Sequence, residues 1–295
     1  MWRPKNINDL LRPVLVLWAG IGFPIYTIDT NEQFINKHSK TLFFSAIIIT
    51  INIICTLLLH TEIKKDVYVF MIYFQLVSVY CQNMGLVYNL YMKKHDIALL
   101  FNEILSNQLL IFKCSKKRIE ILKVHNKFLK YVFINIIGEF AISAHDIAKT
   151  EFYSSEFIYL INFYVGRSFN FIFALLMHLI VLILLELHEK GVSKNISLEN
   201  NFKIYASLHH LSLHVIKTFQ RFVLLKIFTD FTVIATSLYY FVYMSIYMYQ
   251  SSYTYIITLL IWTLIILYFD FVMFYSFEKI LEQVRSSKPI KLKSN

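Results

Sequence analysis

The stretch from Phe157 to Leu187 reads FIYLINFYVGRSFNFIFALLMHLIVLILLEL, and it decides the class of fold. A helix needs about 20 mainly apolar residues to cross the roughly 30 Å of hydrocarbon in a bilayer. The stretch is longer than that and contains no proline. It therefore predicts a membrane-spanning helix that continues past the bilayer without a break.

Five further apolar runs have lengths suited to crossing a bilayer. We therefore predict an all-α fold, a polytopic transmembrane helical bundle with about six spans. The expected spans are Thr41–His60, Val67–Met92, Leu129–Ala148, Phe157–Leu187, Phe222–Tyr249 and Tyr253–Phe277.

The composition agrees with a membrane protein. Hydrophobic residues make up 57% of the 295 positions and charged residues only 16%, whereas soluble domains carry roughly 25% charged residues. Only 6 glycines and 4 prolines are present, which argues against a loop-rich or disordered chain. The 3 cysteines form no CxxC pair, and their odd number predicts structural thiols and no disulfide framework.

The positions of lysine and arginine predict the orientation of the bundle. Cytosolic loops of membrane proteins are enriched in these residues. With the N-terminus in the cytosol, most of the 29 basic residues lie inside, and only Lys64, Lys65 and Lys149 lie outside. We expect a multi-pass protein of the plasma membrane with a cytoplasmic N-terminus. The net charge of +10 thus reports orientation and predicts no nucleic-acid partner.

The chain divides into three parts on this interpretation. Residues 1–40 form a cytosolic N-terminal part, residues 41–277 the six-span bundle, and residues 278–295 a basic cytosolic tail. The apolar stretch Pro13–Ile28 is short for a span and is interrupted by Gly20, Gly22 and Pro24. We interpret it as an amphipathic or re-entrant segment.

The connections between spans differ in length. The three outer connections are short, whereas the inner ones, Lys93–Phe128 and His188–Arg221, are long and basic. Both inner connections have apolar residues at helical spacing. They are predicted to form long helices that extend the neighbouring spans into the cytosol.

Polar residues at membrane depth are candidate functional residues, because burying them in hydrocarbon costs several kcal/mol. Glu139 in the third span and Arg167 in the fourth have similar predicted depths, so an ion pair is plausible. Such a pair would either fix helix packing or line a water-accessible pocket open to the outside. Together with aromatic residues suited to a small organic ligand, the candidate ligand-binding residues are Glu139, His145, Asp146, Asn162, Arg167, Asn170, Tyr73, Tyr240 and Trp262.

Other polar residues point to structural roles. Asp230 is expected to pair with Lys226 or with solvent. The sequence HHLSLH places His210 and His214 at the i, i+4 spacing of a helical metal site, but no second histidine box accompanies it. No GxSxG, P-loop or HExxH motif is present either. We therefore predict no enzyme activity, no metal and no cofactor.

Two stretches carry a resemblance to a known family. They are LLRPVLVLWAGIGFPIYTI from Leu10 to Ile28, and HHLSLHVIKTFQRFVLLKIFTDFTVIATSLYYFVY from His209 to Tyr243. With the short outer loops and long basic inner loops, the whole chain resembles the insect gustatory receptors, relatives of the insect odorant receptors.

The resemblance implies a receptor for small-molecule tastants. Members of the family are ligand-gated cation channels with seven spans and a cytosolic N-terminus, embedded in membrane lipid. They assemble as homo- or hetero-tetramers with related subunits around a pore lined by the seventh span. Each subunit binds its tastant in the outer half, among spans two to six.

The chain departs from the family near its end. The family motif TYhhhhhQF, with h apolar, lies in the last span, whereas Thr254–Trp262 has Ile-Trp in place of Gln-Phe and falls in the sixth expected span. We therefore expect the pore-lining span to be missing, through truncation, an incomplete gene model or decay of the gene. Two alternatives stay open: an odorant receptor of the same superfamily, and a small-molecule transporter, for which inverted repeats and Gly/Pro-broken spans are expected.

Overall fold

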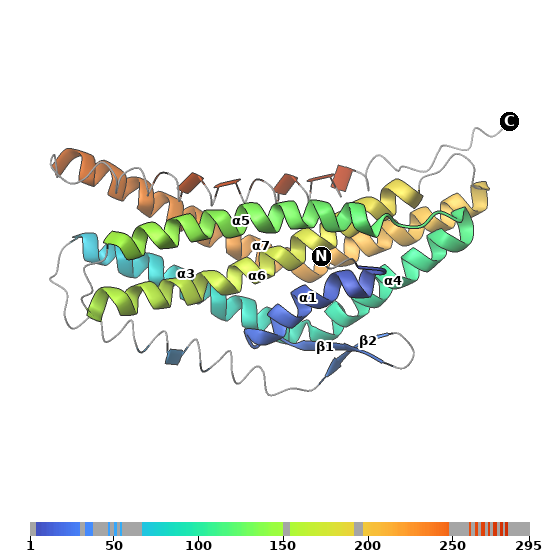
Figure 1. Cartoon of the computed structure of the whole chain (residues 1–295), viewed down its shortest axis with the longest axis horizontal. Coiled ribbons are helices and arrows are strands. Elements are labelled where there is room, and N and C mark those ends of the chain that lie inside the picture. The colour runs from blue at the N-terminus through green and yellow to red at the C-terminus, as the bar shows by residue number, and fades with distance from the viewer. Residues whose placement is uncertain are drawn as a thin grey trace.

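The fold is a bundle of long helices aligned with one axis (Figure 1). The structure is a computed structural model that describes residues 4–29, 33–37, 67–149, 154–191 and 197–247, and isolated residues between 47 and 54 and between 260 and 282. Most of these residues are helical, so the predicted all-α class is confirmed.

The helices follow the apolar runs of the sequence. Val67–Met92, expected as the second span, coincides with helix α3, and the third and fourth expected spans lie within α5 and α6. The fifth lies in α7 up to its end at Tyr247, while most of Thr41–His60 and Tyr253–Phe277 lies outside the described residues. The elements are α1 Ile7–Gly20, β1 Ile25–Ile28, β2 Phe34–Lys37, α3 Val67–Met92, α4 Lys94–Ser115, α5 Ile121–Lys149, α6 Ser154–Gly191 and α7 Leu198–Tyr247.

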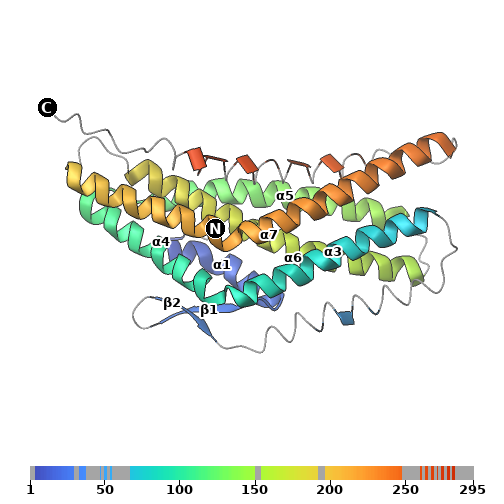
Figure 2. The ribbon, with the colours of Figure 1, turned by 180° about the vertical axis from the view of Figure 1, so that it is seen from behind.

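Both long inner connections are mainly helical, as predicted. The first contains α4 and the start of α5, and the second contains the first turns of α7. The chain turns at Lys93, so α3 and α4 meet at an angle, whereas α7 runs as one helix from end to end of the bundle (Figure 2).

Two helices in the described part are long and apolar enough to cross a membrane, by length and composition: Lys94–Ser115 and Phe171–Gly191. The first lies where we expected a cytosolic connection. Its apolar residues are part of the protein core: Leu100, Phe101 and Ile104 are fully buried. α4 packs with this side against α7 and β2.

The second half of α6 forms the centre of the core. A helix that is apolar all round is typically buried all round, and this one contacts α1, α3, α4, α5 and α7. Its side chains with no more than 2% exposure include Phe173, Leu175, Leu176, Met177, Leu179, Ile180, Val181, Ile183, Leu184 and Leu187.

The N-terminal segment is a helix followed by a hairpin. The Asn6 side chain caps α1 by accepting a hydrogen bond from the Asp9 N–H at 2.7 Å. α1 has 14 residues, and at 1.5 Å per residue its length of about 21 Å is short of a bilayer. It packs on α6 through Trp18, which is fully buried and meets Phe23 edge-on at 4.6 Å between ring centroids. After α1, Gly22 adopts φ 88, a left-handed conformation that favours glycine.

The hairpin was not predicted. β1 and β2 pair antiparallel, from Ile25 opposite Lys37 to Ile28 opposite Phe34. A side chain from α4 fixes this hairpin in place: Asn102 Oδ1 accepts from the Phe34 N–H at 2.6 Å, and Asn102 Nδ2 donates to the Phe34 carbonyl at 3.0 Å.

Gly85 marks the close approach of α3 to α7. A Cβ at this position would lie 2.3 Å from Leu225 Cδ2, whereas a Cβ at Gly20 would have no atom within 4 Å. We expect Gly85→Leu to lower the free energy of unfolding by about 1–3 kcal/mol through overpacking. Gly20→Leu is the matched control and should change the thermal midpoint in detergent far less. Equal effects of the two substitutions would contradict the close approach.

Candidate functional site

The predicted ligand-binding residues fall mainly on helices whose backbone is described. Their side chains lie outside the described residues, so the pocket and the Glu139–Arg167 pair stay predictions. α5 carries Glu139, His145 and Asp146, and α6 carries Asn162, Arg167 and Asn170. Tyr73 lies on α3 and Tyr240 on α7, whereas Trp262 lies wholly outside the described residues.

The pair can be tested by exchanging its charges. α5 and α6 pack against each other, which keeps an ion pair between Glu139 and Arg167 within reach of this fold. Glu139→Arg or Arg167→Glu alone should each destabilise the chain by about 3–5 kcal/mol, because one charge loses its partner in an apolar setting. The double exchange should recover most of the loss in thermal midpoint. If the double variant is as unstable as the sum of the singles, the residues do not pair.

The best-defined polar group in the described part joins the start of α5 to the end of α6. We call Glu120, Lys123, Glu186, Glu189 and Lys190 the α5–α6 ion cluster. Lys123 Nζ lies 2.8 Å from Glu189 Oε2 and 3.3 Å from Glu186 Oε2, and Lys190 pairs with Glu120. The Glu186 side chain is only 3% exposed, and its Oε1 also accepts from the Glu120 N–H at 3.3 Å.

Glu120 and Lys123 of the ion cluster stay charged over a wide pH range. The hydrogen bond and charge of Lys190 lower the pKa of Glu120, and the hydrogen bond to Glu189 raises the pKa of Lys123. The carboxylate therefore contributes stability above its ordinary pKa and loses it as the pH falls through the lowered value. The contribution of the lysine is present below its ordinary pKa and is lost only as the pH rises through the raised value. Because both side chains are substantially solvent-exposed, each contribution is small.

A second set of polar contacts joins α4 to α7. His214 Nδ1 lies 3.0 Å from Glu103 Oε2, and His210 Nδ1 lies 3.8 Å from the same oxygen. His188 of α6 contacts Ser212 of α7 at 3.2 Å, and both are buried. Among the described residues, no group of three or more side chains is arranged to hold a metal ion. The HHLSLH histidines instead connect helices.

The expected pairing of Asp230 is confirmed. Lys226 donates to the Asp230 carboxylate one turn later on α7, and both side chains are nearly buried. Glu186, by contrast, was not singled out from the sequence. A carboxylate that interrupts an apolar run, with Lys190 at i+4, is the signal that could have found it.

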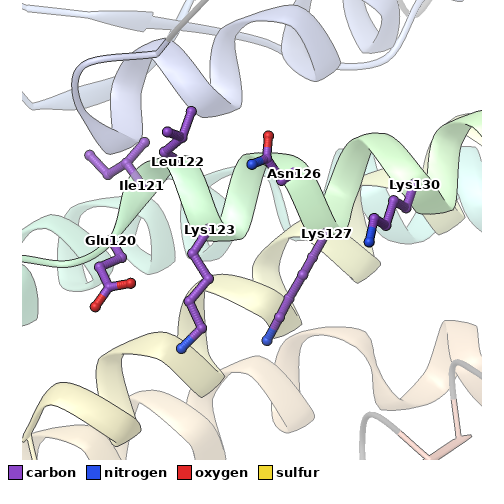
Figure 3. A pocket seen from close by; sticks show the side chains of 7 residues that line it. All are labelled: Glu120, Ile121, Leu122, Lys123, Asn126, Lys127 and Lys130. Atoms are coloured by element: carbon purple, nitrogen blue, oxygen red, sulfur yellow. The ribbon is translucent and has the colours of Figure 1, made fainter.

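The described surface is hollowed along the start of α5 (Figure 3). The hollow has a volume of about 630 Å³, a size common for small-ligand sites. Lys123, Lys127 and Lys130 leave the helix on the same side, at i, i+4 and i+7. The full lining is Glu120, Ile121, Leu122, Lys123, Asn126, Lys127 and Lys130.

No protein-family model matches the chain, and no curated protein matches it in sequence.

Proposed function

We propose that this chain is a polytopic protein of the plasma membrane and a chemosensory receptor subunit of gustatory type. The observation that carries the membrane part is the pattern of exposed side chains on α3, α5 and α7. On α5 and α7 the exposed side chains are charged along one half and apolar along the other, and α3 exposes apolar side chains up to its end, directly before two lysines.

The apolar half is too large for a surface in water. Soluble monomers rarely expose contiguous apolar patches beyond a few hundred Å². Here α3 and α7, which pack against each other, and α5, which packs on α6, expose large apolar side chains that are each between 43% and 70% exposed: Phe74, Val77, Met84, Tyr88, Tyr91 and Met92; Phe133, Ile134, Ile136 and Ile137; and Leu224, Phe228, Phe231, Leu238, Tyr239, Val242 and Ile246.

The change between charged and apolar exposed residues takes place within about one turn at each of the three helices. On one face of α5 the exposed lysines end at Lys130, and the same face continues with Ile134. On α7 the exposed Arg221 is followed by Leu224, which is 64% exposed. On α3 the apolar face ends at Met92, directly before two lysines.

Contacts between the helices place these changes at one level. Tyr131 of α5 stacks on His178 of α6 at 3.9 Å between ring centroids, so Lys130 is level with the residue after His178. His188 lies nine residues after this level on α6, and it contacts Ser212 of α7. Because α7 runs antiparallel to α6, the residue of α7 at the same level lies nine residues after Ser212, at Arg221.

The α3–α7 contact agrees with this level. Gly85 meets Leu225, which places the residues just before Leu225 beside the last turns of α3. A common level for three changes is expected where a bilayer ends. The charged ends of α5 and α7, together with α4, would then form a cytosolic stalk. α7 has 50 residues, and those from Leu198 to Arg221 on the stalk side of this level are about 36 Å long at 1.5 Å per residue.

Cysteine labelling tests the membrane proposal on two sites of the same helix. Asn126 and Ile137 are both exposed on α5. In a background where Cys55, Cys81 and Cys114 are serine, Asn126→Cys should react with a membrane-impermeant maleimide only after the cells are permeabilised. Ile137→Cys should stay unlabelled in both conditions, because lipid covers it.

A soluble fold gives a different result. Both cysteines would then react equally once the cells are opened, since both positions are exposed in the chain itself. Labelling of Asn126→Cys in intact cells would instead reverse the proposed orientation.

The receptor part rests on the resemblance to the insect gustatory receptors. Its layout of a cytosolic N-terminal segment, short outer turns and long inner helices is compatible with the helices described above. In this proposal a small tastant binds among the outer halves of the helices, near Glu139 and Arg167, and gates a cation current in an assembly with related subunits.

Functional expression tests the receptor proposal. The chain is expressed as it stands, and as a fusion that adds the last span of a gustatory receptor, each with and without related subunits. We expect a tastant panel to evoke cation influx in at least one combination, and Arg167→Gln to reduce it. If no tastant evokes current although the protein reaches the cell surface, the receptor proposal is wrong.

A further inference from the structure

The hollow at the start of α5 lies where the proposed bilayer surface would be. Lys130 is the last charged residue of its face, and Ile134 follows one turn later. Lys127 lies a further turn toward the stalk, so the two side chains fall at the depth of lipid headgroups. This placement rests on the membrane proposal above.

Two of its three lysines are available for a ligand. Lys127 and Lys130 are exposed, and neither makes an ion pair within 4.0 Å with any residue in the described ranges. Lys123 is engaged by Glu186 and Glu189. The remaining charged group of the lining, Glu120, is already bonded to Lys190. The part of the hollow nearest the bilayer is therefore positively charged; its lysines have no direct ion pair in the described ranges, and Lys127 interacts with Glu189 only at longer range.

The spacing of the lysines fits more than one phosphate. From Lys127 to Lys130 the helix rises about 4.5 Å at 1.5 Å per residue, so each lysine can contact one of two adjacent phosphates. The hollow has a volume of about 630 Å³, which exceeds that of a sugar-sized ring.

We propose that this hollow binds the headgroup of a multiply phosphorylated inositol lipid in the cytosolic leaflet. Lys127 and Lys130 contact the phosphates, and the acyl chains lie along the exposed apolar face that begins at Phe133. Basic clusters at the cytosolic end of spans attract such lipids, and here the lysine row continues directly into the lipid-facing row of one helix.

The test measures binding of a short-chain phosphatidylinositol bisphosphate to the purified full chain. The variant Lys127→Gln with Lys130→Gln should bind about thirtyfold more weakly, because each lysine near a lipid phosphate contributes about a factor of five. The control is Lys113→Gln with Lys117→Gln. It removes the same charge at the end of α4 and just after it, away from the hollow. It should leave binding unchanged.

Two further arms decide the ligand. Phosphatidylserine, with one net charge, should bind much more weakly, and equal binding would mean a general charge attraction and overturn the proposal. The free inositol trisphosphate headgroup should also bind more weakly than the lipid. Equal binding of headgroup and lipid would assign the hollow to a soluble inositol phosphate.

The outcome is distinguishable from failure of the membrane proposal. If Ile137→Cys is protected from labelling but the lipid binds the Lys127/Lys130 variant as well as the parent, only the headgroup site is wrong. If Ile137→Cys is labelled, the bilayer level itself is wrong and the site loses its basis. Thermal midpoints of all variants are compared first, so that a misfolded variant is recognised. Lys127→Arg with Lys130→Arg, which keeps both charges, should retain binding.

Discussion

Replacing Trp18 with alanine is expected to lower the free energy of unfolding by about 3–5 kcal/mol, the range for removing a large aromatic side chain from a core. The indole has 0% exposure and contacts Phe23 and Phe173, with ring centroids 4.6 and 6.3 Å away. Its N–H has no hydrogen-bond partner among the described residues, so the loss is one of packing. The thermal midpoint in detergent should fall by roughly 10 °C.

The adjacent residue supplies the control. Leu17 lies on the same helix and is 51% exposed, so Leu17→Ala should change the midpoint by little. Trp18→Phe should fall between the two, because a phenyl ring fills part of the site. If Leu17→Ala and Trp18→Ala have equal effects, α1 is not docked on α6 through this face.

Replacing Glu186 with alanine is the second large effect. Glu186 is 3% exposed and lies between Lys123, Lys190 and the Glu120 N–H. Its removal leaves these donors without their buried acceptor, and hydrogen bonds to charged groups contribute about 1.5–3 kcal/mol. We expect a loss of about 2–3 kcal/mol, measured as the thermal midpoint and as faster proteolysis of the native chain.

Glu189 is the matched control for Glu186. It also contacts Lys123, but its side chain is 57% exposed, and exposed ion pairs contribute about 0–1 kcal/mol. Glu189→Ala should therefore be close to neutral. Glu186→Gln keeps the shape and loses the charge, and it should be intermediate. A larger effect at Glu189 than at Glu186 would contradict the burial of the α5–α6 ion cluster.

The sequence predicted the helices well because their signals are local. The apolar run of α3 ends at two lysines, and its bounds coincide with the expected ones. Apolar spacing in the inner connections was sufficient to predict helices there. The pair of Lys226 and Asp230 was predictable for the same reason, since i, i+4 residues on a helix are neighbours.

Features that depend on distant contacts were missed. The hairpin at residues 25–37 is held by Asn102, which lies 68 residues from Phe34. The buried position of Glu186 depends on Lys123, from another helix. Which sides of α1 and α4 face the core is likewise set by the helices they meet. The proposed tastant pocket rests on residues whose side chains lie outside the described part. This candidate site is therefore supported by the sequence alone.

The unbroken course of α7 has a mechanical consequence. A single helix that passes from one end of the bundle to the other acts as a lever. With an arm of about 36 Å from Leu198 to Arg221, a tilt of about 5° displaces its far end by about 3 Å, close to the rise of two residues. α3 and α4 are divided at Lys93 and do not form such a lever. Motion imposed at one end of the molecule therefore reaches the other end through α7.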